Sequence, residues 1–254
     1  MSQSFVHLRQ REPQFWSRRR GWLAAAVGAL LLISWLASPL RVAWDAIDRA
    51  FFLPTNASLG QIDLWDALWA IGNFRAFDLV GAVTMALIFI WSGCRRGQPG
   101  AINLLSRALI GAALGLTAQA IIHKIPDLNR ESPTLTYDNS QRLSELTPWI
   151  KTKDASRSSF PGDHGLILLT LTFYGWPYLV RQARWMAAIS VVLFSFPRLM
   201  SGAHWLSDIS AGSLSAGLIT IGLFYGLSLD GFANQRIQPL LEHLIKMISP
   251  SRWR

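Results

Sequence analysis

The sequence predicts an all-α membrane protein with six transmembrane helices. Of its 254 residues, 51% are hydrophobic and only 15% are charged, whereas a soluble domain carries about 25% charged residues. The twelve tryptophans favour a membrane protein as well, because the amphipathic indole prefers the membrane interface. Long apolar runs that alternate with short basic segments complete the pattern. A single soluble domain is therefore not expected.

Six apolar runs account for the predicted transmembrane helices. The first, residues 22–40, follows Arg18 to Arg20 and at about 20 residues is long enough to cross a bilayer. The alternative is a cleaved signal peptide, whose apolar region is shorter and lies nearer the N-terminus. The other runs are residues 77–92, 102–122, 165–180, 185–200 and 209–228. Of these, 165–180 and 185–200 are short.

Arginines predict the orientation of these helices. Cytoplasmic loops carry an excess of Lys and Arg, and the same ends of the runs are flanked by Arg9, Arg11, Arg18 to Arg20, Arg95, Arg96, Arg181 and Arg184. We therefore expect a cytoplasmic N-terminal segment (1–21), a transmembrane domain (22–228) and a cytoplasmic C-terminal tail (229–254). The periplasmic loops would be residues 41–76, 123–164 and 201–208. The first of these is amphipathic and would lie at the membrane interface. Residues 238–247 predict a short surface helix.

The charge and cysteine content limit the possible partners. The net charge of +9 suits an anionic membrane surface or an anionic substrate, and no recognised motif accompanies it to indicate nucleic acid. The single cysteine, Cys94, allows no intramolecular disulfide and no cysteine metal cage. We expect no metal and no cofactor.

The loop 123–164 carries more basic residues than a translocated loop normally does. A solvated loop with scattered charge explains them as well as an anionic ligand does. The basic residues are Lys124, Arg130, Arg142, Lys151, Lys153 and Arg157.

Three polar clusters interrupt the apolar pattern at one membrane face. They are Lys124 with Arg130-Glu131-Ser132-Pro133, then residues 160–165 (FPGDHG), then Pro197-Arg198 with His204 and Asp208. The hairpin of the fourth and fifth runs should bring His164 near Arg198. His7, His123 and His243 lack such partners and are expected to be ordinary surface or interfacial residues.

The third cluster has the chemistry of phosphoryl transfer. His204 and Asp208 are four residues apart and would share one face of a helix, so that the carboxylate accepts one imidazole N–H and leaves the other nitrogen free. Arg198 supplies a planar cation that matches phosphate oxygens. One histidine would attack phosphorus while the other protonates the leaving oxygen. Individually, each feature also fits a structural role: an interfacial hydrogen bond, a turn at Pro161-Gly162, or a membrane-anchoring arginine.

The motifs resemble those of the type 2 phosphatidic acid phosphatase (PAP2) superfamily. The resemblance rests on Arg198-x5-His204-x3-Asp208, preceded by a Pro-Gly-x-His and an Arg/Pro element. Longer strings, 130–136 (RESPTLT), 152–157 (TKDASR), 159–165 (SFPGDHG) and 196–205 (FPRLMSGAHW), resemble the lipid A 1-diphosphate synthase branch, as does 73–78 (NFRAFD). The similarity runs from about residue 40 to 228.

The resemblance implies a six-helix membrane form and a role for each matched residue. His204 would be the nucleophile that forms a phosphohistidine, Asp208 its orienting partner and His164 the acid. The phosphate contacts would be Arg130, Arg198 and Gly162, with Lys124, Lys153 and Arg157 as further candidates. The branch implies undecaprenyl diphosphate as donor and the 1-phosphate of lipid A as acceptor, at the periplasmic face of the Gram-negative inner membrane.

The sequence departs from the superfamily pattern in two motifs. Five residues, not six, separate Lys124 from Arg130, and the proline comes only at Pro133. Gly162 and Asp163 replace the usual Ser-Gly, and we expect Asp163 to cap the following helix.

Two alternatives to a lipid A phosphotransferase remain. One is a lipid-phosphate phosphatase that uses water as the acceptor, and the other is a non-enzymatic transporter or assembly partner in which His204 and Asp208 only pack.

Overall fold

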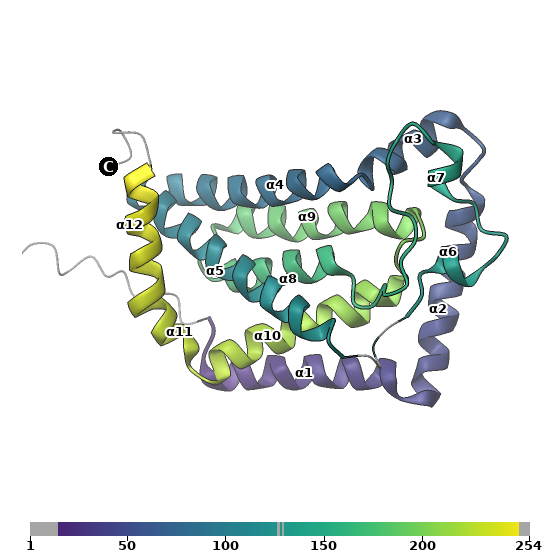
Figure 1. Ribbon diagram of the computed structural model, residues 1–254. Helices are drawn as coiled ribbons and strands as arrows, with labels where there is room; N and C mark the ends of the chain where they lie inside the picture. Colours follow the sequence, from purple (N-terminus) through teal and green to yellow (C-terminus); the bar gives the residue numbers. More distant parts are fainter. Residues whose placement is uncertain (1–14, 126–127, 129, 249–254) are drawn as a thin grey trace, which may run out of the picture.

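The computed structural model describes residues 15–125, 128 and 130–248, and all the regular elements in these ranges are helices. Six of them lie side by side along the long direction of the molecule (Figure 1). The outer parts of both terminal segments lie outside the described residues. These parts include Arg9 and Arg11, which are predicted to be cytoplasmic, and His7, which is predicted to be a surface residue. The long helices are α1 (Arg18–Leu36), α4 (Arg75–Cys94), α5 (Gln98–Ile122), α8 (Asp163–Gly175), α9 (Arg181–Met200) and the π-helix η2 (Asp208–Ser213) that continues into α10 (Leu214–Gly226).

Within the described residues, five helices are long and apolar enough to cross a membrane. They are α1, α4, α5 from Gly100, α9 and the continuous η2–α10. The remaining predicted span forms α8, whose 13 residues rise about 20 Å, less than the roughly 30 Å of hydrocarbon core. Leucines such as Leu30 and Leu79, each 66% exposed, face outward, which suits contact with lipid.

α8 lies in the interior of the bundle, against α4, α5, α9 and α10. Its buried leucines, Leu168 and Leu171, join a core cluster with Met85 and Phe89 of α4 and Val191 of α9. At its far end, the Val180 N–H donates to the Ser92 hydroxyl near the end of α4 (2.9 Å). α8 and the turn after it are therefore surrounded by other helices and not by lipid.

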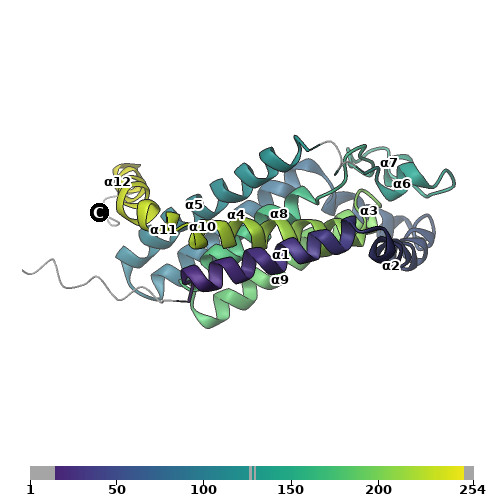
Figure 2. The same cartoon turned by 90° about the horizontal axis from the view of Figure 1, so that it is seen from below.

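The first predicted span is divided at Ala37. α1 ends at Leu36, and α2 (Ser38–Ala57) starts with Pro39 in its first turn. Proline fits the first turn of a helix but not its interior, so the chain turns there. α2 crosses the end of the bundle beside α3 (Asp63–Gly72), α6 (Pro133–Thr136) and α7 (Leu143–Leu146) (Figures 1 and 2). The predicted amphipathic segment 41–76 is therefore mostly helical.

The opposite end of the bundle carries the basic flanks of the helices. Arg18 donates to the Gly226 carbonyl oxygen (3.5 Å), and the charges of Arg96 and Arg184 are close enough to interact. α12 (Gln238–Ile248) crosses this end (Figure 1) after α11 (Leu229–Phe232) and η3 (Ala233–Ile237). The predicted surface helix at 238–247 is confirmed, and the arginine-rich helix ends lie at one end, as the sequence predicts.

Glycines allow α1 and α10 to pack in backbone contact. A Cβ added to Gly222 would lie 2.4 Å from the Ala25 nitrogen and 2.7 Å from the Gly21 oxygen. Both atoms belong to the backbone, so no side-chain movement can relieve the clash. Small residues at such crossings are what brings helices together in membranes.

We therefore expect Gly222→Ala to separate α1 from α10 and to destabilise the protein by about 1–3 kcal/mol, as overpacking does. The measurement is the denaturation midpoint of purified protein in detergent. Gly231→Ala is the matched control, because a Cβ there meets nothing within 4 Å. Equal midpoints for the two variants would contradict this packing.

Candidate active site

A small, closely packed cavity at the α2 end of the bundle, too narrow for a water molecule as its side chains stand, brings together the second and third polar clusters of the sequence. Its lining comes from the start of α8, the end of α9 and the turn before η2, and consists of Gly162, His164, Gly165, Ser195, Arg198, His204 and Ile209. The hairpin of α8 and α9 thus places His164 near Arg198, as the sequence predicts. Gly162 is tightly packed there, since a Cβ would lie 3.1 Å from Ile209 and 3.2 Å from the Ser213 hydroxyl.

The His204 ring is held by a backbone carbonyl group. Its Nδ1 lies 2.8 Å from the Ser159 carbonyl oxygen and 3.4 Å from Oδ2 of Asp208. A carbonyl oxygen only accepts hydrogen bonds, so Nδ1 carries a hydrogen, and in the neutral ring the lone pair is therefore on Nε2. That leaves Nε2 available as a nucleophile.

The expectation that His204 and Asp208 share a helix face is wrong. His204 lies in the turn before the helix, and Asp208 begins η2. Oδ2 of the buried Asp208 accepts the Trp205 N–H (2.8 Å), which fixes the turn that carries His204. The Ser159 contact was not predictable from the sequence, because it depends on the path of the loop before α8.

Arg198 is 4% exposed and is held by the α3–α4 junction. Its Nη1 donates to both the carbonyl and the side-chain oxygen of Asn73, and its Nη2 donates to Oδ1 of Asp78 (2.6 Å). Asn73 follows α3, and Asp78 lies in the first turn of α4. A buried guanidinium needs such acceptors to offset its desolvation.

Asp78 also contacts His164. Its Oδ1 lies 2.9 Å from His164 Nε2, while His164 Nδ1 is buried with no hydrogen-bond partner among the described residues. Sequence reasoning missed Asp78 as a site residue. The available signal was the 73–78 string, in which three polar residues, Asn73, Arg75 and Asp78, stand at the start of an apolar run.

Arg130 lies apart from this cavity. Its Nη1 contacts Oδ2 of Asp48 and the Ser207 hydroxyl (both 2.8 Å), and its Nη2 lies 3.2 Å from Oδ1 of Asp45. Its guanidinium stacks 4.3 Å from the Trp205 ring centroid. The structure thus separates Arg130 from Arg198, because the carboxylates on α2 hold Arg130 on the other side of the His204 turn.

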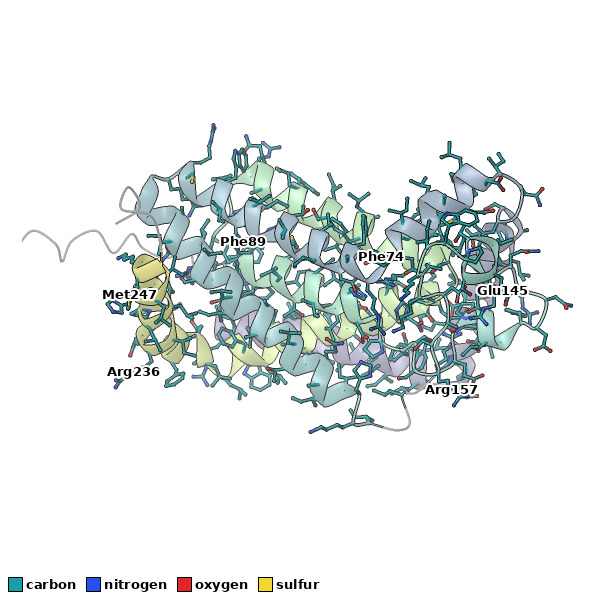
Figure 3. The ribbon with its side chains drawn as sticks, turned by 45° about the horizontal axis from the view of Figure 1, so that its top comes forward. Phe74, Phe89, Glu145, Arg157, Arg236 and Met247 are labelled. Carbon is teal, nitrogen blue, oxygen red and sulfur yellow. The ribbon has the colours of Figure 1, made fainter. Side chains whose placement is uncertain are left out.

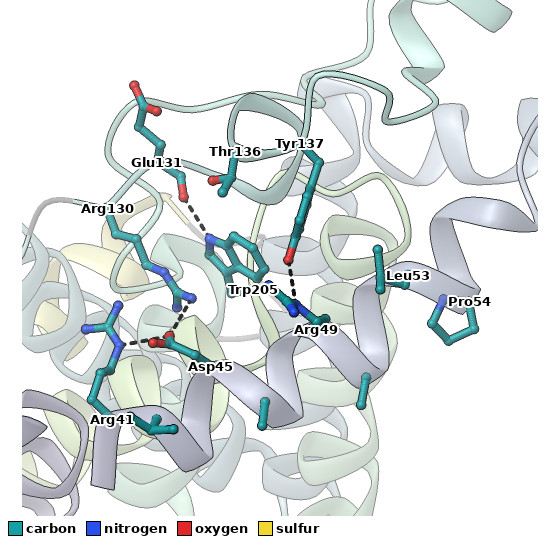
Figure 4. A pocket seen from close by; sticks show the side chains of 13 residues that line it. Arg41, Asp45, Arg49, Leu53, Pro54, Arg130, Glu131, Thr136, Tyr137 and Trp205 are labelled. Carbon is teal, nitrogen blue, oxygen red and sulfur yellow. Dashed lines mark hydrogen bonds and ion pairs between the residues drawn. The ribbon is translucent and has the colours of Figure 1, made fainter. Parts of the chain in front are cut away.

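Arg130 lines a larger groove between α2 and the segment 130–137 (Figure 4). The groove has a volume of about 890 Å³ and contains Arg41 and Arg49 as well. Arg41 pairs with Asp45 (2.9 Å), and Arg49 donates to the Tyr137 hydroxyl (3.2 Å). The sequence did not indicate these two arginines, because both lie in a segment predicted only to rest at the interface.

Asp48 is the buried acceptor that joins α2 to the site. Its two oxygens accept the Ser207 N–H (2.7 Å) and the Ser207 hydroxyl (2.6 Å). Burial raises the pKa of the Asp48 carboxyl, while the hydrogen bonds from Ser207 and the charge of Arg130 act in the opposite direction. Asp208 Oδ1, 3.7 Å from Arg130, adds a weaker electrostatic contact to this network.

The remaining predicted phosphate contacts are exposed. Lys124 follows α5, and Lys153 and Arg157 lie on the loop before α8; Figure 3 shows Arg157 on the outer surface, at the same end as Glu145. None of the three lines the small cavity or the groove.

Two expectations about the neighbourhood of α8 were wrong. Asp163 does not cap α8, because Gly162 occupies the cap position and Asp163 begins the helix. His123 is not without a partner, since its Nε2 lies 2.7 Å from Oδ1 of Asp163.

Removing the Asp48 carboxylate should destabilise the protein strongly. Asp48→Ala leaves Arg130 and the Ser207 N–H without their buried acceptor, and breaking a buried pair in this way costs about 3–5 kcal/mol. Asp45→Ala is the control, because it removes a second Arg130 partner that is 50% exposed and should cost at most about 1 kcal/mol. Thermal unfolding in detergent measures both, and equal effects would argue against the buried network.

Comparison with known proteins agrees with the motifs. The model of the PAP2 superfamily matches residues 108–230. The chain is 34% identical over 225 residues to the lipid A 1-diphosphate synthase of Escherichia coli (strain K12), covering 89% of this chain and 90% of that protein. No solved structure matches the chain significantly. The extent of this similarity shows that the chain belongs to the PAP2 superfamily.

Proposed function

We propose that the protein transfers a phosphoryl group from undecaprenyl diphosphate to the 1-phosphate of lipid A. The products would be undecaprenyl phosphate and lipid A 1-diphosphate. The observation that carries the proposal is the small cavity, where His204 with a free Nε2, a second histidine and a buried arginine converge. The family is one of phosphoryl-transfer enzymes, and the name of the E. coli relative indicates lipid A as the acceptor and a 1-diphosphate as the product.

In the first step, Nε2 of His204 attacks the terminal phosphorus of the donor. A bond forms between nitrogen and phosphorus, and the bond from phosphorus to the bridging oxygen breaks. His164 acts as the general acid, giving its Nε2 proton to that oxygen as undecaprenyl phosphate leaves. General acid catalysis of this kind contributes about 10²–10⁴-fold to the rate.

In the second step, an oxygen of the lipid A 1-phosphate attacks the phosphohistidine. The bond from nitrogen to phosphorus breaks, His204 is regenerated and lipid A 1-diphosphate leaves. The proton of the attacking phosphate hydroxyl passes to His164, which restores the acid for the next cycle. Arg198, with Gly162 beside it, would hold the transferred group, because a planar guanidinium matches two phosphate oxygens. Asp208 would act by fixing the turn that carries His204.

A second anionic substrate needs a second set of cations. Arg130 in the groove, and Lys124, Lys153 and Arg157 on the loop, are our candidates for the phosphates of the lipid headgroups. The groove supports this assignment for Arg130, because its volume of about 890 Å³ lies in the range of ligand sites and it opens beside the interfacial helix α2. The exposed loop cations would act through charge alone.

We further propose six passages through the inner membrane, with residues 22–228 as the membrane domain. α8 and residues 176–180 would form the fourth passage in the interior of the bundle, where they need not span lipid. The arginine-rich end, with both terminal segments, would be cytoplasmic, and the cavity would face the periplasm. Undecaprenyl diphosphate, lipid A and inner-membrane lipids would be the partners of the protein.

The function is tested with purified protein in detergent, donor labelled in its terminal phosphate, and lipid A. Label should appear in lipid A, and His204→Ala should reduce both this transfer and the labelled enzyme by more than about 10³-fold, because nucleophile and intermediate are lost together. His243→Ala, on α12 at the other end of the molecule, is the matched control and should transfer normally. If the protein consumes the donor equally fast with and without lipid A, and no label appears in lipid A, the protein is instead a phosphatase that uses water as the acceptor.

The orientation is tested with the single native cysteine. Cys94 is exposed at the end of α4, so the unmodified protein should react with a membrane-impermeant thiol reagent only after the inner membrane is broken. The variant Cys94→Ala/Asn139→Cys should react once the outer membrane alone is permeabilised, because the exposed Asn139 lies between α6 and α7 at the opposite end. The reverse pattern would contradict the proposed orientation.

A further inference from the structure

Asp78 occupies the position between the two cationic groups of the cavity. One oxygen, Oδ1, accepts from Arg198 Nη2 (2.6 Å) and lies 2.9 Å from His164 Nε2. A carboxylate only accepts hydrogen bonds, so the His164 Nε2 hydrogen points at Asp78. These are the two donors that a phosphate held between His164 and Arg198 would need.

Arg198 has one fixed and one exchangeable side. Its Nη1 is held by the two oxygens of Asn73, which is fully buried and donates in turn to the Lys153 carbonyl oxygen. Its Nη2 is held only by Asp78 among the contacts described, and the Asp78 side chain is 37% exposed. Arg198 would therefore stay in place if Asp78 moved away.

The cavity also holds a polar group without a partner. Ser195 is 4% exposed, and its hydroxyl has no hydrogen-bond partner in the described part of the chain. It lines the cavity together with His164, Arg198 and His204. Buried hydroxyls are nearly always hydrogen-bonded, and this one lies where it can donate to a ligand oxygen that enters the cavity.

We propose that Asp78 is an internal counter-anion that a phosphate group of the substrate displaces. Before phosphate binds, its carboxylate neutralises the buried Arg198 and holds His164 in position. When phosphate enters, its oxygens take over Nη2 of Arg198 and the hydroxyl of Ser195, and Asp78 turns toward its exposed side. The His164 Nε2 hydrogen, released from Asp78, then faces the oxygen that leaves.

This exchange keeps the charge of the cavity balanced throughout. A buried cation without a counter-ion is costly, so Arg198 requires one anion before and after substrate binds. The proposal rests on the proposed function only in that phosphate binds in this cavity, and it applies equally to a transferase and a phosphatase. Asp78 is a positioning residue in this scheme, because it leaves before the reaction starts.

The test is the binding of inorganic phosphate to purified protein in detergent at pH 7, followed by calorimetry. Asp78→Asn keeps the size of the side chain but removes the competing charge, so it should bind phosphate about tenfold more tightly than the unmodified protein. Asp78→Glu restores a carboxylate and should return the affinity to within about threefold of the original. Asp63→Asn, an exposed residue at the start of α3, removes the same charge at the same end and should change nothing.

A purely structural role predicts the opposite result, since loss of a support for Arg198 and His164 would weaken phosphate binding. Weaker or equal binding by Asp78→Asn, in a variant whose unfolding midpoint shows that it is folded, overturns the proposal. No binding to any of the proteins overturns it as well, because an exchangeable carboxylate requires that the same donors accept phosphate. Since no lipid takes part, these outcomes are independent of whether transfer to lipid A occurs.

Discussion

The buried charge of Arg198 is the constraint on which the rest of the site depends. A guanidinium that is 4% exposed at the end of an apolar helix must be given acceptors by neighbouring elements. Asn73 and Asp78 provide them, and this fixes the junction of α3 and α4 against the end of α9. Asn73 also binds the Lys153 carbonyl oxygen, so the long loop before α8 is fixed by the same contact. The cavity thus takes its shape from the pairing of one cation.

A second buried network holds the other side of the His204 turn. Asp48 of α2 accepts two hydrogen bonds from Ser207 and pairs with Arg130. Asp208, the next residue after Ser207, fixes the Trp205 N–H and approaches Arg130. The turn between α9 and η2 is therefore held from both sides by elements distant in sequence. Such fixed surroundings allow catalytic groups to act without reorganisation.

The sequence predicted those parts of the structure that depend on local pattern. Apolar runs gave the long helices, and the order of polar clusters placed His164, Arg198 and His204 at one end of the bundle. The contacts of Asp48 were not predictable, because they arise from how the interfacial segment 41–76 folds across that end. The 73–78 string signalled Asp78, but its contacts with Arg198 and His164 depend on how the start of α4 lies against α8 and α9. Local chemistry did carry two signals that the hydropathy pattern hid. Pro39 prevents the first helix from continuing through it and begins a new one. The short apolar run that forms α8 fits a helix in the interior of the bundle better than one that faces lipid.

The carbonyl contact of His204 links the proposed nucleophile to the loop before α8. In a histidine oriented by a carboxylate, the tautomer is set by a charged side chain, whereas here the nearest acceptor of Nδ1 is the Ser159 carbonyl oxygen. Ser159 is itself held by Arg130, since its N–H donates to the Arg130 carbonyl oxygen (2.7 Å). The backbone of Arg130 therefore supports the His204 ring through Ser159, while its guanidinium faces the groove. The backbone of Arg130 is two hydrogen bonds away from Nδ1 of His204. A ligand that shifted the Arg130 guanidinium would therefore act on a residue that is connected to His204, so the groove and the small cavity are linked through Arg130 and Ser159.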